Sequence, residues 1–366
     1  MSGKVLTIRD LNRTTLHRQM LLARTPGTVT DAVSRLAGLQ AQNAMAPFVG
    51  LWTRLDGFGR QDLLQALQDR TVVKATMMRG TLHLTTAEDY LDFRGTLQPL
   101  LTAASESISR GRAGQLNVPA LVAAAREFLE DSHRSFAEIS THLAGLHPGT
   151  DVGAMRYAVR THLPLVQVPV PRAWGYPGNP KFALAEDWLG RSIPAGKELP
   201  ALIRRYLAAF GPASVTDMQA WSGFTNLKQM VETLRRELTV YRDENRRELF
   251  DLPGLPLVDP DTPAPERFLP EYDNLLLSHA KRTRVLAGEH RPKVYVPVLR
   301  VRSTFLVDGF VAGTWRVEKA GGVATLLVEP FSVLPKASRR ELETEGEKLV
   351  RFAGYDSKSH EVRFAD

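Results

Sequence analysis

Three uncharged amides, Gln40, Gln42 and Asn43, stand close together in an otherwise apolar stretch, residues 35–52. A buried amide without a partner costs about 1–3 kcal/mol, so these groups need partners in the protein or in a ligand. An amide offers a carbonyl acceptor and NH2 donors, so it can orient a water molecule although it is not a strong base. Two interpretations remain open from the residues alone. Either the protein itself satisfies the amides, which then cap or bridge structural elements, or a group outside the chain does.

The composition of the chain indicates an ordinary globular protein with a basic surface. The 366 residues, 43% of them hydrophobic, correspond to about two to three domains. Forty-seven Lys and Arg against 40 Asp and Glu give a net charge of +7, and the sequence pI is about 9.6. This balance favours a nucleic-acid partner, although solvated helix faces also carry arginines.

Several classes of protein are excluded or disfavoured by the same numbers. With no cysteine, disulfides and thiolate metal sites are ruled out. The N-terminus lacks the apolar segment of a signal peptide, and no run reaches the ~18 apolar residues of a membrane helix. We therefore expect a soluble cytoplasmic protein that makes no membrane contact and associates with the nucleoid when bound to DNA.

The middle of the chain has the element order of a winged helix-turn-helix. Within residues 197–258, apolar spacing indicates helices at 201–210 and 225–238 with a short helix between them. The stretch 239–252 alternates apolar and polar residues around a turn, which predicts a hairpin. In such a unit a helix enters the major groove of duplex DNA.

The same order recurs before this unit, and a different pattern follows it. Residues 116–196 give a second copy, whose Ser135 and Glu138 have capping-box spacing. Residues 1–115 give a weaker third copy with inserted segments. Residues 259–366 read as a β-rich C-terminal unit packed on the last winged helix. The predicted fold class is α+β, mainly helical, with three tandem winged helix-turn-helix units that form one extended concave surface.

Four segments give the chain a resemblance to a known family over nearly its whole length. They are GLQAQ (38–42), RGTLHLTT (79–86), RFLPEYDNLLLSHAKRTRVL (267–286) and TFLVDGFVAGTWR (304–316). The chain resembles the AlkZ/YcaQ family of winged-helix DNA glycosylases. Family members carry a Gln-x-Gln motif in the AlkZ-like branch and Gln-x-Asp in the YcaQ-like branch. With glutamine at both 40 and 42, this chain resembles the AlkZ-like branch.

The resemblance implies a basic C-shaped cleft and excision of N-alkylated purines, with unhooking of interstrand crosslinks in some members. It also implies self-resistance to DNA-alkylating natural products. Alkylation of guanine at N7 makes the base a cation that departs neutral, so no acid catalyst is required. We expect Gln40 and Gln42 to be the catalytic pair that orients the attacking water. The nine histidines show no metal-binding spacing, so neither metal nor cofactor is expected.

Further site residues follow from the same segments. His83 is a secondary active-site candidate, with a buried core histidine as the alternative. Glu271 and Asp273 offer carboxylates, but an anchoring role for them is favoured. A basic hairpin within 289–303 is expected to enter the DNA cleft. The residues predicted to contact DNA are Asn43, Arg79, Arg156, Arg160, Lys228, Arg282, Arg284, Arg291, Lys293, Tyr295, Arg300 and Arg302.

Three functional classes compete. The leading one is a monofunctional DNA glycosylase that acts as a monomer on double-stranded DNA containing an alkylated purine. The second is a non-enzymatic winged-helix regulator, which would usually dimerise on a symmetric site. The third is a protein that binds and shields adducted DNA. Release of a base separates the first class from the other two.

Overall fold

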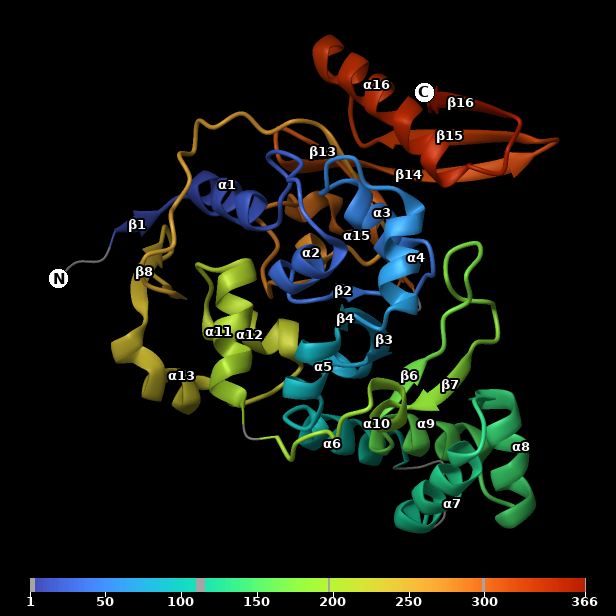
Figure 1. The fold of residues 1–366 in the computed structure, drawn as a ribbon. Helices are drawn as coiled ribbons and strands as arrows, with labels where there is room; N and C mark the ends of the chain where they lie inside the picture. Colours follow the sequence, from blue (N-terminus) through green and yellow to red (C-terminus); the bar gives the residue numbers. More distant parts are fainter. Residues whose placement is uncertain (1–3, 110–115, 197, 298–299, 366) are drawn as a thin grey trace.

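Two of the predicted winged-helix units share one antiparallel sheet in the computed structural model, which describes residues 4–109, 116–196, 198–297 and 300–365 (Figure 1). The strand order is β2-β4-β3-β6-β7-β5, and Ala75 of β3 pairs with Val166 of β6. The sheet therefore crosses the predicted boundary at residue 115, a position that itself lies outside the described residues. The strands are β2 (Leu39–Gln40), β3 (Val72–Thr76), β4 (Leu82–Thr86), β5 (Arg134–Ser135), β6 (Leu165–Gln167) and β7 (Lys181–Leu184).

Helices pack around this sheet in both units. The predicted capping box at Ser135 is confirmed, because Ser135 and Glu138 bond each other's backbone N–H groups. The helices of the first unit are α1 (Ile8–Arg18), α2 (Val29–Arg35), α3 (Ala46–Trp52), α4 (Arg60–Gln68), the 3-10 turn η1 (Met78–Gly80), α5 (Ala87–Arg94) and α6 (Gln98–Ser109). Those of the second are α7 (Val118–Glu130), α8 (Phe136–Leu146), α9 (Val152–His162) and α10 (Ala185–Leu189).

The third unit has the element order predicted for residues 197–258. Ser214 caps its middle helix, and Gly223 ends that helix with a positive φ of 89° that suits glycine. A strand from the N-terminus, β1 (Val5–Leu6), pairs in parallel with the hairpin of this unit. The elements are α11 (Leu199–Phe210), α12 (Val215–Ser222), α13 (Lys228–Leu234), η2 (Arg235–Glu237), β8 (Thr239–Asp243) and β9 (Glu248–Asp251).

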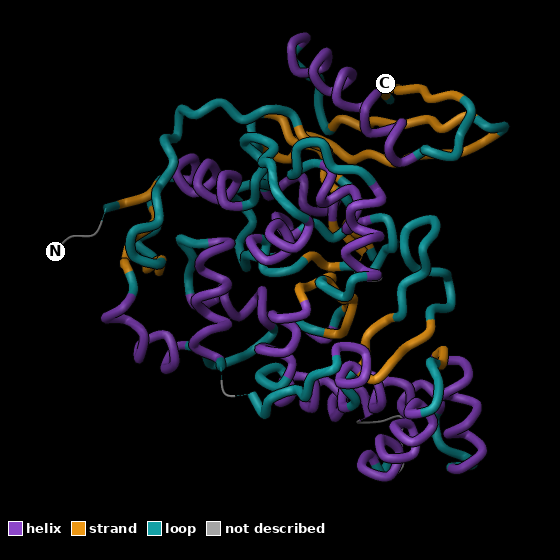
Figure 2. Tube along the Cα trace, in the orientation of Figure 1, coloured by secondary structure: helices purple, strands orange, loops and turns teal. Residues whose placement is uncertain are grey.

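The C-terminal unit is a five-stranded sheet of order β10-β13-β14-β15-β16, with α16 lying against it (Figure 2). The predicted hairpin turn at Asp308 and Gly309 joins β13 to β14. Its elements are β10 (Arg267–Leu269), α14 (Asn274–Leu277), η3 (Gly288–His290), α15 (Arg291–Val294), β11 (Tyr295–Val296), β12 (Arg300–Val301), β13 (Thr304–Val307), β14 (Phe310–Ala320), β15 (Val323–Pro330), α16 (Lys336–Ala353) and β16 (Ser359–Phe364).

The expected packing of this unit on the third winged helix is wrong for most of its surface. Trp315 and Leu349 share one hydrophobic core with Phe48 and Trp52 of α3 in the first unit. The segment 278–284, which lies between α14 and η3, does reach the third unit, where the Ala280 N–H donates to Asp217. Apolar residues on both sides of the contact decide this placement, and their pairing is not encoded in local spacing.

A fully buried ion pair fastens the C-terminal unit to the first unit. Arg54 donates to both carboxylate oxygens of Asp273 at 2.9 and 2.8 Å, and neither side chain is exposed. Arg54 Nε donates to the Gln19 carbonyl, and Nη1 also donates to the Gly50 carbonyl. Because all three nitrogens of the guanidinium donate to protein acceptors, the pair tolerates burial that would otherwise be costly. The anchoring role predicted for Asp273 is confirmed.

Substitution of Asp273 by Asn should therefore destabilise the protein strongly. It leaves the Arg54 charge buried without its counter-ion, which costs about 3–5 kcal/mol in the free energy of unfolding. Urea unfolding followed by circular dichroism measures the change. Glu361→Gln breaks the exposed pair between Glu361 and Arg363 and serves as the control, with an expected change below about 1 kcal/mol. Equal effects of the two substitutions would contradict the role given to the buried pair.

Candidate active site

The Gln-x-Gln motif begins at the edge strand of the six-stranded sheet. Gln40 of β2 lies opposite His83 of β4, and the Ala41 N–H continues the ladder to the Leu82 carbonyl at 2.8 Å. The preceding turn requires glycine at position 38, where φ is +83° and a Cβ would lie 3.1 Å from the Leu84 carbonyl oxygen. The left-handed conformation of Gly38 thus sets the direction in which the chain enters β2.

A side chain from the C-terminal unit holds this turn. The Asn274 amide donates to the carbonyls of Leu36 and Gly38 at 3.2 and 2.6 Å. Asn274 follows directly on Asp273, so the buried ion pair and the clamp on the turn belong to one segment. The position of Gln40 therefore depends on residues more than 230 positions away in the sequence.

Arg79 links Gln40, His83 and the third unit. Its Nη2 donates to Gln40 Oε1 at 2.8 Å and lies 3.3 Å from His83 Nε2, while Nη1 donates to the Trp221 carbonyl. Burial, with the charge of Arg282 nearby, lowers the pKa of Arg79 to about 10, so the guanidinium stays charged at neutral pH. Arg79 also adopts a left-handed backbone conformation with φ at 55°. Gln40 itself is only 7% exposed, so its carbonyl is committed to Arg79.

His83 is held as a neutral imidazole. Its Nδ1 lies 3.0 Å from the Thr81 carbonyl, which can only accept, so Nδ1 carries the proton and Nε2 accepts from Arg79. Burial and the Arg79 charge lower the pKa of His83 to about 3. A histidine in this state cannot serve as an imidazolium acid at neutral pH. It orients Arg79, and through Arg79 it orients Gln40.

The other two amides face solvent. Gln42 Oε1 accepts a long bond from the Leu82 N–H at 3.4 Å, which leaves its amide available to a ligand. Asn43 Oδ1 accepts from the Met45 N–H, and its Nδ2 donates to Glu271 Oε2 at 3.1 Å. The structure thus brings Gln40, Gln42, Asn43, Arg79 and His83 together.

Glu271 joins this loop to the predicted DNA-contacting hairpin, a link that sequence reasoning missed. Glu271 Oε1 accepts from Nε and Nη2 of Arg300 at 3.1 and 2.7 Å, while Oε2 accepts from Asn43. A cavity of about 410 Å³ adjoins these contacts. The sequence predicts an anchoring role for the carboxylates of the EYD stretch, but the partners of Glu271 lie far away in sequence and were not predicted.

The hairpin itself is short. β11 and β12 pair Tyr295 with Val301 and Val296 with Arg300, and residues 298–299 at the predicted tip lie outside the described residues. Arg291 and Lys293 of α15 are exposed beside it. Arg302 is paired with Glu329, and the Tyr295 hydroxyl donates to the Leu276 carbonyl.

The other predicted DNA contacts are dispersed. Arg160 of α9 donates to the Gly80 carbonyl at 2.6 Å and so touches the turn that carries Arg79, while Arg156 on the same helix is exposed. Lys228 is exposed on α13 in the third unit. Arg282 is half-buried and donates to carbonyls within its own segment. Arg284 is enclosed by protein, 5% exposed, and bonds Thr15 and Pro212, away from the solvent that DNA would occupy.

Two absences concern the described residues. No three His, Asp or Glu side chains among them are grouped closely enough to hold a metal ion. In the same parts of the chain, no helix combines the length and the apolar character needed to cross a bilayer.

Comparison with known proteins identifies the class to which this fold and site belong. The family model described as DNA glycosylase AlkZ-like matches residues 33–352, so the chain belongs to the AlkZ-like DNA glycosylase family. It is 25% identical to the interstrand DNA cross-link repair glycosylase of Streptomyces sahachiroi, over 93% of this chain and 94% of that protein. The solved structure of Streptomyces sahachiroi DNA glycosylase AlkZ matches with a TM-score of 0.78 at 25% identity, over 99% and 100% of the two chains. The expected family is confirmed.

The low pKa of His83 predicts a loss of stability at mildly acidic pH. His83 binds a proton near pH 6.5 in the unfolded chain and near pH 3 in the folded chain. The contribution of neutral His83 to the free energy of unfolding is therefore fully present above pH 6.5 and is lost as the pH falls through this window. The slope per histidine reaches about 1.4 kcal/mol per pH unit. Urea unfolding at pH 7, 6 and 5 should show a shallower decline for His83→Asn than for the unchanged protein. Parallel declines would contradict the neutral assignment.

Proposed function

We propose that the protein is a monofunctional DNA glycosylase that hydrolyses the N-glycosidic bond of N7-alkylguanine or related alkylpurine adducts. Its substrates include bulky natural-product adducts or interstrand crosslinks in double-stranded DNA, and it acts in repair or self-resistance. The observation that carries the proposal is the paired amide arrangement, in which Gln40 is fixed by Arg79 and Gln42 is open to solvent. The crosslink-repair name of the Streptomyces sahachiroi relative supports the substrate class.

The bonding of the two amides suggests their separate roles. Because Gln40 Oε1 accepts from Arg79, its NH2 group is the part that remains to donate to a water oxygen. Gln42 Oε1 has a weak backbone partner at 3.4 Å and can accept a hydrogen bond from the same water. A water held in this way directs its remaining lone pair toward the anomeric carbon. Positioning of this kind replaces the activation that a strong base would provide.

The charge state of the site suits a substrate that is already activated. N7-alkylguanine carries a positive charge and leaves as a neutral base, so no proton donor is needed. His83, whose pKa is about 3, is neutral and supplies none. Gln42 presents its carbonyl dipole to the oxocarbenium-like sugar that forms as the base departs. The proposed reaction uses neither a metal ion nor a cofactor.

Basic residues around the amides suit the DNA backbone. Arg291, Lys293 and Arg300 are exposed near the hairpin, and Arg156 is exposed on α9. Phosphate contacts of this kind position a duplex without reading its sequence. Since three non-identical units of one chain supply the surface, a monomer suffices.

A base-release assay tests the proposal. The protein is incubated with a duplex carrying one N7-methylguanine in the presence of EDTA, and hot alkali then cuts at abasic sites. We expect cleavage by the unchanged protein and a fall of about 100-fold in the rate for Gln40→Ala and Gln42→Ala, because the water loses its fixed position. Gln65→Ala, at an exposed glutamine of α4, is the matched control and should keep full activity. Duplex binding should survive in all variants.

Each alternative predicts a different result in the same assay. Adduct binding without abasic product, with a methyl and with a bulky adduct alike, would identify a shielding protein. Sequence-specific binding to undamaged DNA without release would identify a regulator. Loss of activity on addition of EDTA would contradict the metal-free reaction.

A further inference from the structure

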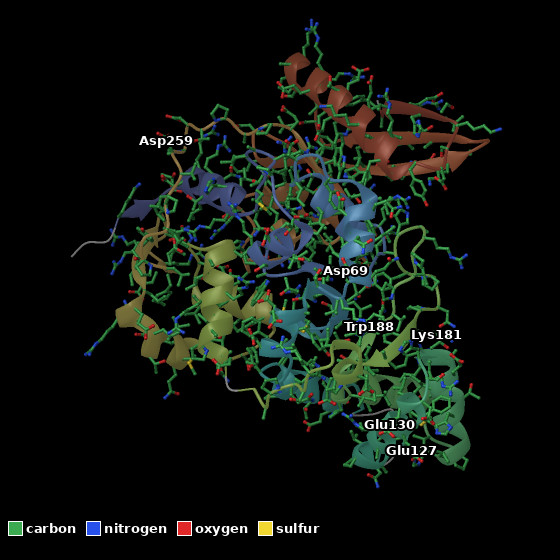
Figure 3. All side chains as sticks on the ribbon, viewed as in Figure 1. Asp69, Glu127, Glu130, Lys181, Trp188 and Asp259 are labelled. Atoms are coloured by element: carbon green, nitrogen blue, oxygen red, sulfur yellow. The ribbon has the colours of Figure 1, made fainter. Side chains whose placement is uncertain are left out.

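A second groove lies beside the amide pair, between α9 and the six-stranded sheet. One stripe of α9, formed by Gly153, Arg156, Tyr157 and Arg160 at helical spacing i, i+3, i+4 and i+7, makes one wall. The sheet contributes Leu82, Gln167 and Phe182, and residues 178–180 of the β6–β7 connection close one end. The groove has a volume of about 410 Å³. Lys181, labelled in Figure 3, marks the place where β7 begins beside it.

Two polar atoms in the walls of this groove lack partners within the described residues. Gln167 is 6% exposed, and its Oε1 is buried without a hydrogen bond. Arg160 Nε is likewise buried and unpaired, although Nη2 of the same side chain bonds the Gly80 carbonyl. Buried polar atoms in folded proteins are rarely left unpaired. An acceptor and a donor beside the half-buried ring of Tyr157 suit the edge and one face of a nucleobase.

The charges around the groove favour a neutral ligand over a cationic one. Its lining includes Arg156 and Arg160 but no Asp or Glu among the described residues. Burial and the nearby Arg156 lower the pKa of Arg160, which shows that positive charge is already disfavoured there. A neutral ring is therefore accepted more readily than a cationic one. N7-alkylguanine changes from cation to neutral molecule when it leaves the sugar.

The groove adjoins the reacting atoms of the proposed reaction. Leu82 lines it, and the Leu82 N–H bonds Gln42 Oε1 at 3.4 Å. This contact puts one wall of the groove within reach of a base whose anomeric carbon lies beside Gln42. We propose that this groove is the subsite that receives the purine as it leaves, an inference that rests on the proposed glycosylase function.

In the step assigned to the groove, the bond between C1′ and N9 breaks and its electron pair stays with the base. This pair neutralises the positive charge of the alkylated ring. The water oxygen forms the new bond to C1′, and its proton passes to solvent. The arginines disfavour the cationic base before the step and tolerate the neutral base after it, so the groove promotes departure.

Binding of free 7-methylguanine, followed by isothermal titration calorimetry and saturation-transfer NMR, tests the inference without catalysis. The unchanged protein should bind it, and Gln167→Leu should weaken binding about tenfold because the ring loses its acceptor. Tyr157→Ala removes a half-buried ring and gives a second variant if Gln167→Leu folds poorly. Gln65→Leu is the control. The released base should also inhibit base release, less so in Gln167→Leu.

The outcomes separate this inference from the proposed function. If the protein releases base but neither binds 7-methylguanine nor is inhibited by it, the inferred role of the groove is contradicted and the proposed glycosylase activity is not. If the protein binds 7-methylguanine through Gln167 but releases no base, the proposed glycosylase activity is contradicted and a base-binding groove remains. Displacement of 7-methylguanine by inorganic phosphate would show that the groove binds a DNA phosphate instead and would overturn the inference.

Discussion

The buried pair between Arg54 and Asp273 is the interaction on which the geometry of the site depends. The chain on either side of Asp273 performs two further tasks, since Asn274 clamps the turn before β2 and Glu271 bonds both Asn43 and Arg300. Three residues within the segment 271–274 of the C-terminal unit therefore fix the loop of Gln42 and Asn43, the turn before it and the hairpin. Because the pair is buried and bidentate, this arrangement has little freedom to vary.

The electrostatics of the site follow from a single buried cation. Arg79 determines the orientation of Gln40, keeps His83 neutral and reaches the third unit through the Trp221 carbonyl. A carboxylate in place of Gln40 would form an ion pair with Arg79 and lose much of its basicity. A neutral amide keeps its donor side free beside the same cation. The choice of glutamine at this position is thus consistent with a reaction that needs placement of water more than deprotonation of it.

Local patterns predicted much of the fold, and long-range contacts account for what they missed. The helix order of the third unit, the capping box at Ser135 and the turn at Asp308 depend on neighbours in sequence, so they could be predicted from it. The pairing of Ala75 with Val166 joins strands about 90 residues apart and depends on how two units pack. Arg284 carries no local mark of burial, because arginine is ordinarily a surface residue. The amide pair was predicted from its composition and its family resemblance. Arg79 and His83 were also predicted as site residues, but their role in holding Gln40 was not.

The sheet shared by the first two units fixes the spacing between the strands that carry the site and the groove. Leu82 on β4 and Gln167 on β6 are separated by one intervening strand, so two ladder spacings, about 10 Å in all, set the distance between their strands. Hydrogen-bonded spacings of this kind scarcely stretch, unlike a gap closed by a mobile loop. A larger alkyl group cannot widen the space across the strands. Under the proposed function, room for a bulky adduct must therefore lie along the strand direction or outward into solvent, where the ladder imposes no limit.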